Sequence, residues 1–298
     1  MNLFDQLVNQ ALENNTELAH LRVVVEKELL HHDILLALSE SGMLEKLCFI
    51  GGTCLRACYG SNRLSEDLDF TGGDGFDRAD LAELKSILIN RLQAKYGLGV
   101  EVSEPQKESG NVDTWKLRVQ TRPDDRGMPA QRIHIDVCAV PSYMELPRTL
   151  LNPYGVDMGT QGLILKAQAL EEIYTDKILA FALRRGRIKN RDLWDLLWLK
   201  QQRIEPALGL ITSKLNDHRV EEKVFLQQAK ERVAVLCTEE QIKKDFRQEM
   251  RRFLPARVVA ETVNSDRFWD YLANEMVELM RRVEHSLAGE GNTDSFVM

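Results

Sequence analysis

The stretch FIGGTCLRACYGSNRLSEDLDF, residues 49–70, decides the fold expected for this chain. It opens at the end of an apolar run, KLCFI, that is typical of a buried strand and that ends at Gly51 and Gly52. TCLRACYG then has the pattern of a helix start, and DLDF alternates polar and apolar residues as a strand does. A strand, a tight turn, a helix and a second strand are therefore predicted to follow one another here.

The regions on either side differ in their hydrophobic period. Residues 3 to about 46 predict two helices, and FDRADLAELKSILINRLQAKYG, residues 76–97, returns to the helical period. Three later segments read as strands, with PDDRGMPA as a hairpin loop before the last of them: LGVEVSE at 98–104, DTWKLRVQTR at 113–122 and QRIHIDVCAV at 131–140. From about residue 161 the pattern is helical. We predict an α+β fold, with a mixed sheet and flanking helices over 1–158 and a helical domain over 159–298.

Composition limits the classes of protein to consider. The 298 residues are 44% hydrophobic and carry a net charge of -7, which argues against a protein that coats nucleic acid by charge alone. Five cysteines form no CxxC pair, which favours reduced thiols. The N-terminal MNLFDQLVNQ has neither a basic region nor an apolar core, and no run is long enough for a membrane span. A soluble cytoplasmic protein that does not bind membranes is expected.

Three aspartates are candidate metal ligands. In DLDF the strand period places Asp67 and Asp69 on one face, and in RIHIDVCAV it places Asp136 on the polar face together with His134 and Cys138. Converging carboxylates repel one another unless a cation lies among them, and sets of oxygen ligands suit Mg²⁺ or Mn²⁺ shared with substrate phosphates. The spacing therefore predicts a metal–nucleoside triphosphate (NTP) site in which Asp136 also orients or deprotonates the attacking hydroxyl.

The glycine turn supplies the phosphate contacts of this predicted site. Gly51 and Gly52 let the backbone approach phosphate oxygens, and Thr53 begins a helix whose N-terminal amides favour an anion. Taken alone, a GG turn or a DxD strand is an ordinary structural feature. The order of apolar strand, GGT, DLD and a further strand with an aspartate is what favours catalysis.

With these motifs the chain resembles the AbiEii/AbiGii-type nucleotidyltransferase toxins of type IV toxin–antitoxin and phage-abortive-infection systems, a branch of the polymerase-beta-like superfamily. The resemblance runs through EKELLHHDILLALSESG, FIGGTCLRACYG, RLSEDLDF, RIHIDV and EEIYTDKILAFALRRGRIKNRDLWDL, from residue 26 to about 197. It implies a nucleotidyltransferase fold whose helical domain completes the nucleotide and acceptor cleft.

The resemblance also assigns roles residue by residue. It implies that Gly52, Thr53 and Ser65 lie at the triphosphate and that Asp67, Asp69 and Asp136 are the acidic ligands. Lys177 matches a helical lysine that faces the nucleotide, with a solvated lysine as the alternative. Asp192 and Asp195 match the final acidic motif, with helix capping as their alternative role. Which of the two acids is the functional one stays open. Arg63 either pairs with phosphate or fixes the loop before DLDF.

A basic segment contrasts with the acidic whole. Between residues 176 and 203 the chain has eight basic and three acidic side chains, a local charge of +5. Such a patch can guide an RNA backbone, and the alternative is a set of solvated helix faces. The candidate RNA contacts are Arg184, Arg185, Arg187 and Lys189. Because tRNA is a known acceptor class in the toxin family, the resemblance implies an RNA acceptor.

The expected activity is transfer of a nucleoside monophosphate from an NTP to an acceptor, the 3′ end of tRNA, which inhibits translation. A cognate antitoxin is a further expected partner. The alternatives are a phosphotransferase that uses the same NTP site on a protein or small molecule, and a binding module without chemistry. Packing or surface roles, and not metal binding, are expected for His31 and His32 on their helix. Trp194 and Trp198, four residues apart, are expected in the core or in an interface, and not as a base-stacking platform.

Overall fold

The computed structural model describes residues 2–106, 111–122 and 129–290. Residues 123–128 of the predicted hairpin loop and the chain end from residue 291 onward lie outside these residues. The chain divides into two compact units. The first comprises Met1–Ala169 with Phe253–Ala256, and the second Leu170–Arg252 with Arg257–Met298.

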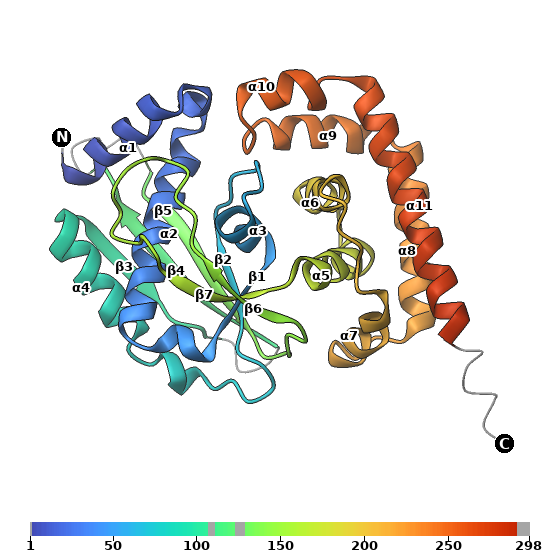
Figure 1. The fold of residues 1–298 in the computed structure, drawn as a ribbon, viewed down its shortest axis with the longest axis horizontal. Helices are drawn as coiled ribbons and strands as arrows, with labels where there is room; N and C mark the ends of the chain where they lie inside the picture. The colour runs from blue at the N-terminus through green and yellow to red at the C-terminus, as the bar shows by residue number, and fades with distance from the viewer. Residues whose placement is uncertain (1, 107–110, 123–128, 291–298) are drawn as a thin grey trace. The chain divides into compact units, whose positions relative to one another are not determined.

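The first unit is built on a mixed sheet (Figure 1). Among the described residues seven strands form it, in the order β3-β4-β5-β2-β1-β7-β6. The pairs β2–β5 and β1–β7 are parallel and the others antiparallel. The strands are β1 (Cys48–Ile50), β2 (Leu68–Thr71), β3 (Gly99–Ser103), β4 (Val112–Gln120), β5 (Gln131–Cys138), β6 (Glu145–Thr149) and β7 (Ile164–Gln168). The predicted mixed sheet is confirmed.

Helices flank this sheet. They are α1 (Leu3–Asn14), α2 (Arg22–Glu40), α3 (Gly51–Tyr59) and α4 (Leu84–Tyr96), with short 3₁₀ turns η1 (Thr16–Leu21), η2 (Met43–Lys46) and η3 (Arg78–Leu81). Helix α2 packs against α1, α4 and β5, so it is covered on most of its circumference (Figure 1). This explains why nearly every residue from Val24 to Leu38 is buried, including charged ones.

The prediction that strands end before residue 161 is wrong. Strand β7 pairs in parallel with β1, with Ala167 opposite Phe49, and antiparallel with β6. Strand β6, at the edge of the sheet, was not predicted either. All five of its residues are exposed, so its sequence shows no alternation of buried apolar and exposed polar residues. The first unit consequently extends to Ala169, past the predicted boundary at 158.

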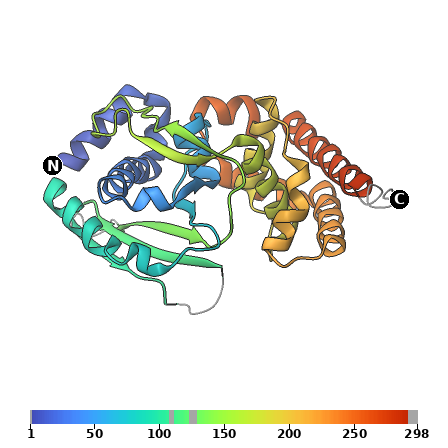
Figure 2. The ribbon, with the colours of Figure 1, turned by 60° about the horizontal axis from the view of Figure 1, so that its bottom comes forward.

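The second unit is helical in the part of the chain that the structure describes. It contains α5 (Leu170–Leu183), α6 (Asn190–Gln201), η4 (Leu208–Leu210), α7 (Ile211–Asp217), α8 (Glu222–Thr238), α9 (Glu240–Met250), α10 (Ala256–Val258, whose first residue belongs to the first unit), η5 (Val259–Val263) and α11 (Asp266–Glu290). Helices α8 and α11 lie side by side (Figure 2). Trp194 and Trp198 are buried, and the ring centroids of Trp194 and Phe268 lie 5.8 Å apart, so both tryptophans belong to the core, one of the two places expected for them. No described helix is long and apolar enough to cross a membrane.

Candidate active site

The glycine turn forms the first turn of α3. Strand β1 ends at Ile50 and α3 begins at Gly51, two residues earlier than the predicted start at Thr53. Gly51 has φ of +75°, and a Cβ at this position would lie 2.8 Å from Oδ2 of Asp69. Residue 51 must therefore be glycine for two reasons, its backbone conformation and the closeness of the Asp69 carboxylate. The N-terminal amides of a helix lack intrahelical acceptors and favour an anion there.

A Gly51→Ala variant separates these two reasons. We expect loss of about 1–2 kcal/mol of folding free energy from the left-handed backbone alone. We also expect about tenfold weaker binding of a magnesium–NTP complex, because the methyl group displaces the Asp69 carboxylate, a misplacement of the kind that costs binding and rate. Urea unfolding and calorimetric titration measure the two effects.

Gly73→Ala is the matched control. Gly73 has φ of +73°, but a Cβ there would meet no atom of the structure within 4 Å. This variant should lose similar stability and keep its nucleotide affinity. Equal affinities for the two alanine variants would contradict the role given to the contact between residue 51 and Asp69.

The sheet brings two of the predicted acids together. In the parallel pair β2–β5, Asp69 lies directly opposite Asp136, and Asp69 also faces Ile50 of β1. Asp67 comes one residue before β2, and its Oδ1 accepts a hydrogen bond of 3.1 Å from the backbone amide of His134. All three aspartates are half-buried. Neighbouring parallel strands thus hold two carboxylates side by side, where like charges repel.

One oxygen of this cluster lacks a protein donor. Oδ1 of Asp136 is buried and accepts no hydrogen bond from any residue that the structure describes. A buried acceptor without a partner costs about 1–3 kcal/mol, and more when it is charged. A cation held between Asp69 and Asp136 would remove this cost and the repulsion of the two carboxylates.

The acids fit a metal ion that substrate phosphates help to hold. Within the described ranges no group of three or more His, Cys, Asp or Glu side chains is arranged to hold a metal ion. Magnesium, however, is usually bound by one or two carboxylates, with water and phosphate oxygens as its other ligands. The Asp69 and Asp136 pair matches this kind of site. Coordination by Asp67 stays a prediction.

The loop before β2 is tied to α3 by hydroxyl groups. Oγ1 of Thr53 donates to the backbone oxygen of Asp67 and lies 2.6 Å from Oγ of Ser65. Because a hydroxyl has a single proton, Ser65 must be the donor in the second bond. Thr53 and Ser65 are both buried. Their hydroxyls therefore hold the loop in this structure, and their contact with the triphosphate stays a prediction.

Arg63 and the paired histidines lie inside the first unit. Arg63 is 3% exposed, and its Nη1 donates to the backbone oxygen of Leu64 at 3.0 Å. This geometry supports fixing of the loop, and a phosphate contact by Arg63 stays a prediction. His31 and His32 are buried, and burial lowers the pKa of both, that of His32 to about 4. Of the two expected roles, packing and surface, burial supports packing for both histidines.

A second cluster of predicted residues lies in the helical unit. Nζ of Lys177 on α5 is 2.7 Å from Oδ1 of Asp192 and 2.9 Å from Oδ2 of Asp195, both on α6. The side chains are 12%, 2% and 1% exposed, so Lys177 is not a solvated lysine. The α6 N-cap is Lys189, and it makes no side-chain capping bond. Both acids bind Lys177, so the structure does not favour one of them over the other.

Further cations surround this ion pair. Nη2 of Arg184 lies 3.2 Å from Oδ2 of Asp192. Burial tends to raise the pKa of Asp192, but Lys177, Lys189 and Arg184 outweigh it and hold the pKa well below its usual range. Burial lowers the pKa of Lys189, and Asp192 opposes this effect. Asp192 is therefore charged at neutral pH.

The candidate RNA contacts follow α5. Arg184, Arg185 and Arg187 are exposed and Lys189 is half-buried. Arg232 of α8 donates through Nη1 to the backbone oxygen of Gly186 at 2.6 Å and through Nη2 to that of Arg184. A guanidinium group thus holds the backbone of this basic loop, while the loop directs Arg185 and Arg187 to solvent.

Two contributors were missed from the sequence. Glu28 accepts a hydrogen bond from the amide of Ser65, and Arg232 holds the basic loop. Charged residues within EKELL or KERV look like ordinary helix surface, and no spacing rule relates them to a site that far along the chain.

The sequence and the fold of this chain are both similar to those of known proteins. Residues 33–274 match the family described as nucleotidyl transferase AbiEii toxin, type IV toxin–antitoxin system. The fold is similar to that of the nucleotidyltransferase toxin MenT4 from Mycobacterium tuberculosis, with 18% identity and a TM-score of 0.60 over 96% of this chain and 98% of that one. JHP933 from Helicobacter pylori gives 17% identity and a TM-score of 0.46 over 90% and 97% of the two chains. No curated protein matches.

Proposed function

Because the chain belongs to the nucleotidyl transferase AbiEii toxin family, we propose that it uses a divalent metal ion to transfer a nucleoside monophosphate from an NTP to the 3′ end of tRNA. Membership of the family makes it a nucleotidyltransferase toxin and implies an NTP substrate and a cognate antitoxin. The metal dependence and the RNA acceptor are the proposed parts. Such a modification of tRNA would inhibit translation.

The observation that carries the metal dependence is the buried Oδ1 of Asp136, which lacks a donor in the described residues and belongs to the register partner of Asp69. A pair of carboxylates in this state favours a divalent cation over a neutral ligand. Mg²⁺ or Mn²⁺ bound there would lower the pKa of the attacking hydroxyl and stabilise the charge on the leaving pyrophosphate.

The residues of the chain have separate tasks in this reaction. We assign to Asp136 the task of orienting the attacking hydroxyl and accepting its proton. The backbone at Gly51 and Gly52 offers the N-terminal amides of α3 to phosphate oxygens. The resemblance implies that the positive charge of Lys177 faces the nucleotide. In this structure Asp192 and Asp195 balance that charge.

The support for an RNA acceptor is the basic loop after α5. Arg185 and Arg187 are exposed, and Arg232 holds the loop that carries them. Contacts of this kind bind phosphates without regard to base sequence, and their strength falls as salt rises. The choice of tRNA follows the acceptor class of the toxin family.

The test is a labelling reaction with the purified protein, total RNA, Mg²⁺ or Mn²⁺ and each of the four NTPs. We expect label in tRNA from one or more α-labelled NTPs and none from γ-labelled NTP, because the transferred group contains the α-phosphorus. The label should disappear when a chelator removes the metal. Label from γ-labelled NTP alone would show a phosphotransferase, and label in a protein or small molecule would exclude tRNA as the acceptor.

A further inference from the structure

Helix α2 contains three buried acids with different surroundings. Glu26, Glu28 and Asp33 are at most 5% exposed. Glu26 accepts hydrogen bonds from the side chains of Arg22, Thr121, Arg122 and Gln131, and Asp33 accepts them from Lys95 and Tyr96. None of these partners lies in the loop at 65–67. Among the three acids, Glu28 is bonded to the loop that leads into Asp67.

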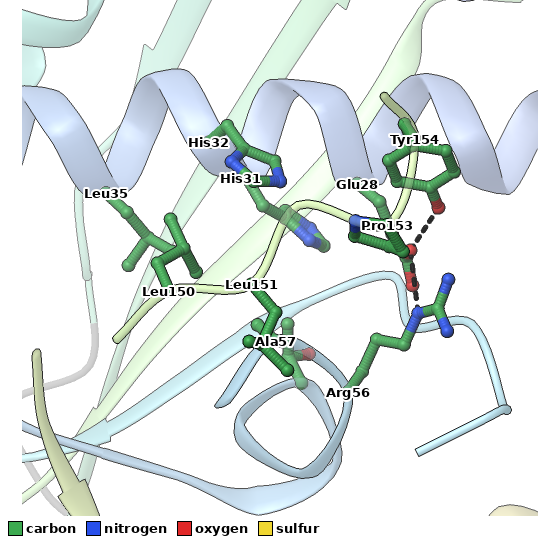
Figure 3. A pocket seen from close by; sticks show the side chains of 11 residues that line it. Glu28, His31, His32, Leu35, Arg56, Ala57, Leu150, Leu151, Pro153 and Tyr154 are labelled. Carbon is green, nitrogen blue, oxygen red and sulfur yellow. Dashed lines mark hydrogen bonds and ion pairs between the residues drawn. The ribbon is translucent and has the colours of Figure 1, made fainter. Parts of the chain in front are cut away.

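The Glu28 carboxylate joins three parts of the first unit. Oε1 accepts the backbone amide of Ser65 at 2.7 Å, and Oε2 accepts Nε of Arg56 at 3.1 Å and the hydroxyl of Tyr154. Figure 3 shows the carboxylate between the Arg56 and Tyr154 side chains. Hydrogen bonds to an ionised acceptor are about twice as strong as neutral ones. The position of the Ser65 backbone is therefore strongly held.

Two neighbours on α2 hold the next residue of the loop. Nζ of Lys27 pairs with Oε1 of Glu66 at 2.8 Å, and Nε2 of His31 lies 3.1 Å from the backbone oxygen of Glu66. Because a carbonyl oxygen only accepts, Nε2 of His31 carries the proton in this bond. Three residues that lie within five positions of one another on α2, Lys27, Glu28 and His31, thus bind this helix to residues 65 and 66.

The cavity beside Glu28 is not itself a substrate site. It is lined by Glu28, His31, Thr53, Arg56 and Tyr154, among others, and has a volume of about 20 Å³ (Figure 3). That volume is far too small for a nucleotide. Glu28 must act through its hydrogen bonds and not by contact with substrate.

A chain of hydrogen bonds continues from Glu28 to the candidate active site. Glu28 holds the amide of Ser65, Ser65 donates to Oγ1 of Thr53, and Thr53 donates to the backbone oxygen of Asp67. Thr53 lies in the first turn of α3, beside Gly51 and Gly52. We propose that Glu28 is a positioning residue that sets the loop at 65–67 and the start of α3 for binding of the metal–NTP complex. This inference rests on the proposed function.

A pair of isosteric variants tests the role of Glu28. Glu28→Gln and Asp33→Asn each remove one buried negative charge of α2 that is bonded to a basic side chain and a tyrosine hydroxyl. We expect both to be less stable than the wild type. For Glu28→Gln alone, the dissociation constant for a non-hydrolysable NTP analogue with Mg²⁺ should rise by about tenfold or more, the effect of losing a hydrogen bond to a charged group.

A milder pair protects the test against failure to fold. Tyr154→Phe removes one donor from Glu28, and Tyr96→Phe removes one donor from Asp33. We expect the nucleotide affinity of Tyr154→Phe to be about threefold weaker, which is the effect of losing one neutral hydrogen-bond donor. The nucleotide affinity of Tyr96→Phe should not change. Calorimetry gives the dissociation constants, and steady-state kinetics with an α-labelled NTP separate KM from kcat. The rise should appear in KM.

The outcomes are distinguishable. If the wild type binds no metal–NTP complex and labels no acceptor, the proposed function fails and this inference fails with it. If the wild type binds and labels, but the Glu28 and Asp33 variants lose affinity equally, or neither loses any, the positioning role alone is overturned. A loss confined to the Glu28 and Tyr154 variants supports it.

Discussion

Replacing Asp69 by asparagine is expected to lower the rate of nucleotidyl transfer by about a thousandfold while leaving the protein at least as stable as the wild type. The rate falls because an amide cannot bind the proposed metal ion or balance its charge as a carboxylate does. The stability is kept because the variant is isosteric and removes one of two like charges on opposed residues of β2 and β5. Transfer from an α-labelled NTP and thermal unfolding in chelator measure the two quantities.

Asp113→Asn is the control for Asp69→Asn. Asp113 lies on β4 of the same sheet and pairs with Arg78. Its replacement should leave the transfer rate unchanged. Transfer by Asp69→Asn at close to the wild-type rate would remove Asp69 from the metal site. A marked loss of its stability would show instead that the carboxylate is needed for folding.

Replacing Lys177 by methionine is expected to lower the free energy of unfolding by about 3 kcal/mol and to abolish most of the transfer activity. Methionine keeps most of the buried volume but leaves the carboxylates of Asp192 and Asp195 at 2% and 1% exposure without the Lys177 cation. Breaking a buried pair by removing one partner is costly because the other charge stays buried. Urea unfolding of the helical unit measures the loss.

A second substitution separates stability from activity. In Lys177→Met combined with Asp195→Asn, Asp192 keeps its pair with Arg184 and one buried charge is gone. We expect this double variant to regain a large part of the lost stability and none of the lost activity. Recovery of both together would mean that Lys177 serves the fold of the helical unit and takes no part in the reaction.

Local sequence patterns were enough to locate the strands that carry the acids. DLDF and RIHIDV alternate because one face of each strand is buried in the core, as the Phe49 and Phe70 rings, 5.1 Å apart, illustrate. The same reasoning failed for β6 and β7. Strand β6 has no buried face, and the strand over 164–168 continues directly into α5, so the helical pattern of α5 concealed it.

Burial was the main property that sequence reasoning could not assign. For Lys177 the sequence leaves solvent exposure open, and for Asp192 and Asp195 it leaves helix capping open. Packing of α5 on α6 places all three in one ion cluster. Glu28 lies on a helix that is covered on most of its circumference, and its charge falls on a buried face. The amino-acid sequence alone does not indicate which charged residues will be buried by neighbouring helices and strands.

Local periodicity was enough to predict the α+β fold, the glycine turn and three candidate aspartates, because each depends on the period of a strand or a helix within a few residues. The stretch at 49–70 contains the glycine turn and two of these aspartates, Asp67 and Asp69, while Asp136 belongs to the segment at 131–140. The three-dimensional fold was needed to show that Asp69 lies opposite Asp136, that Gly51 leaves room for the Asp69 carboxylate and that Glu28 holds the loop before Asp67. Those relations join residues that are 18 to 67 positions apart, and strand register and helix packing, which act through space, are what set them.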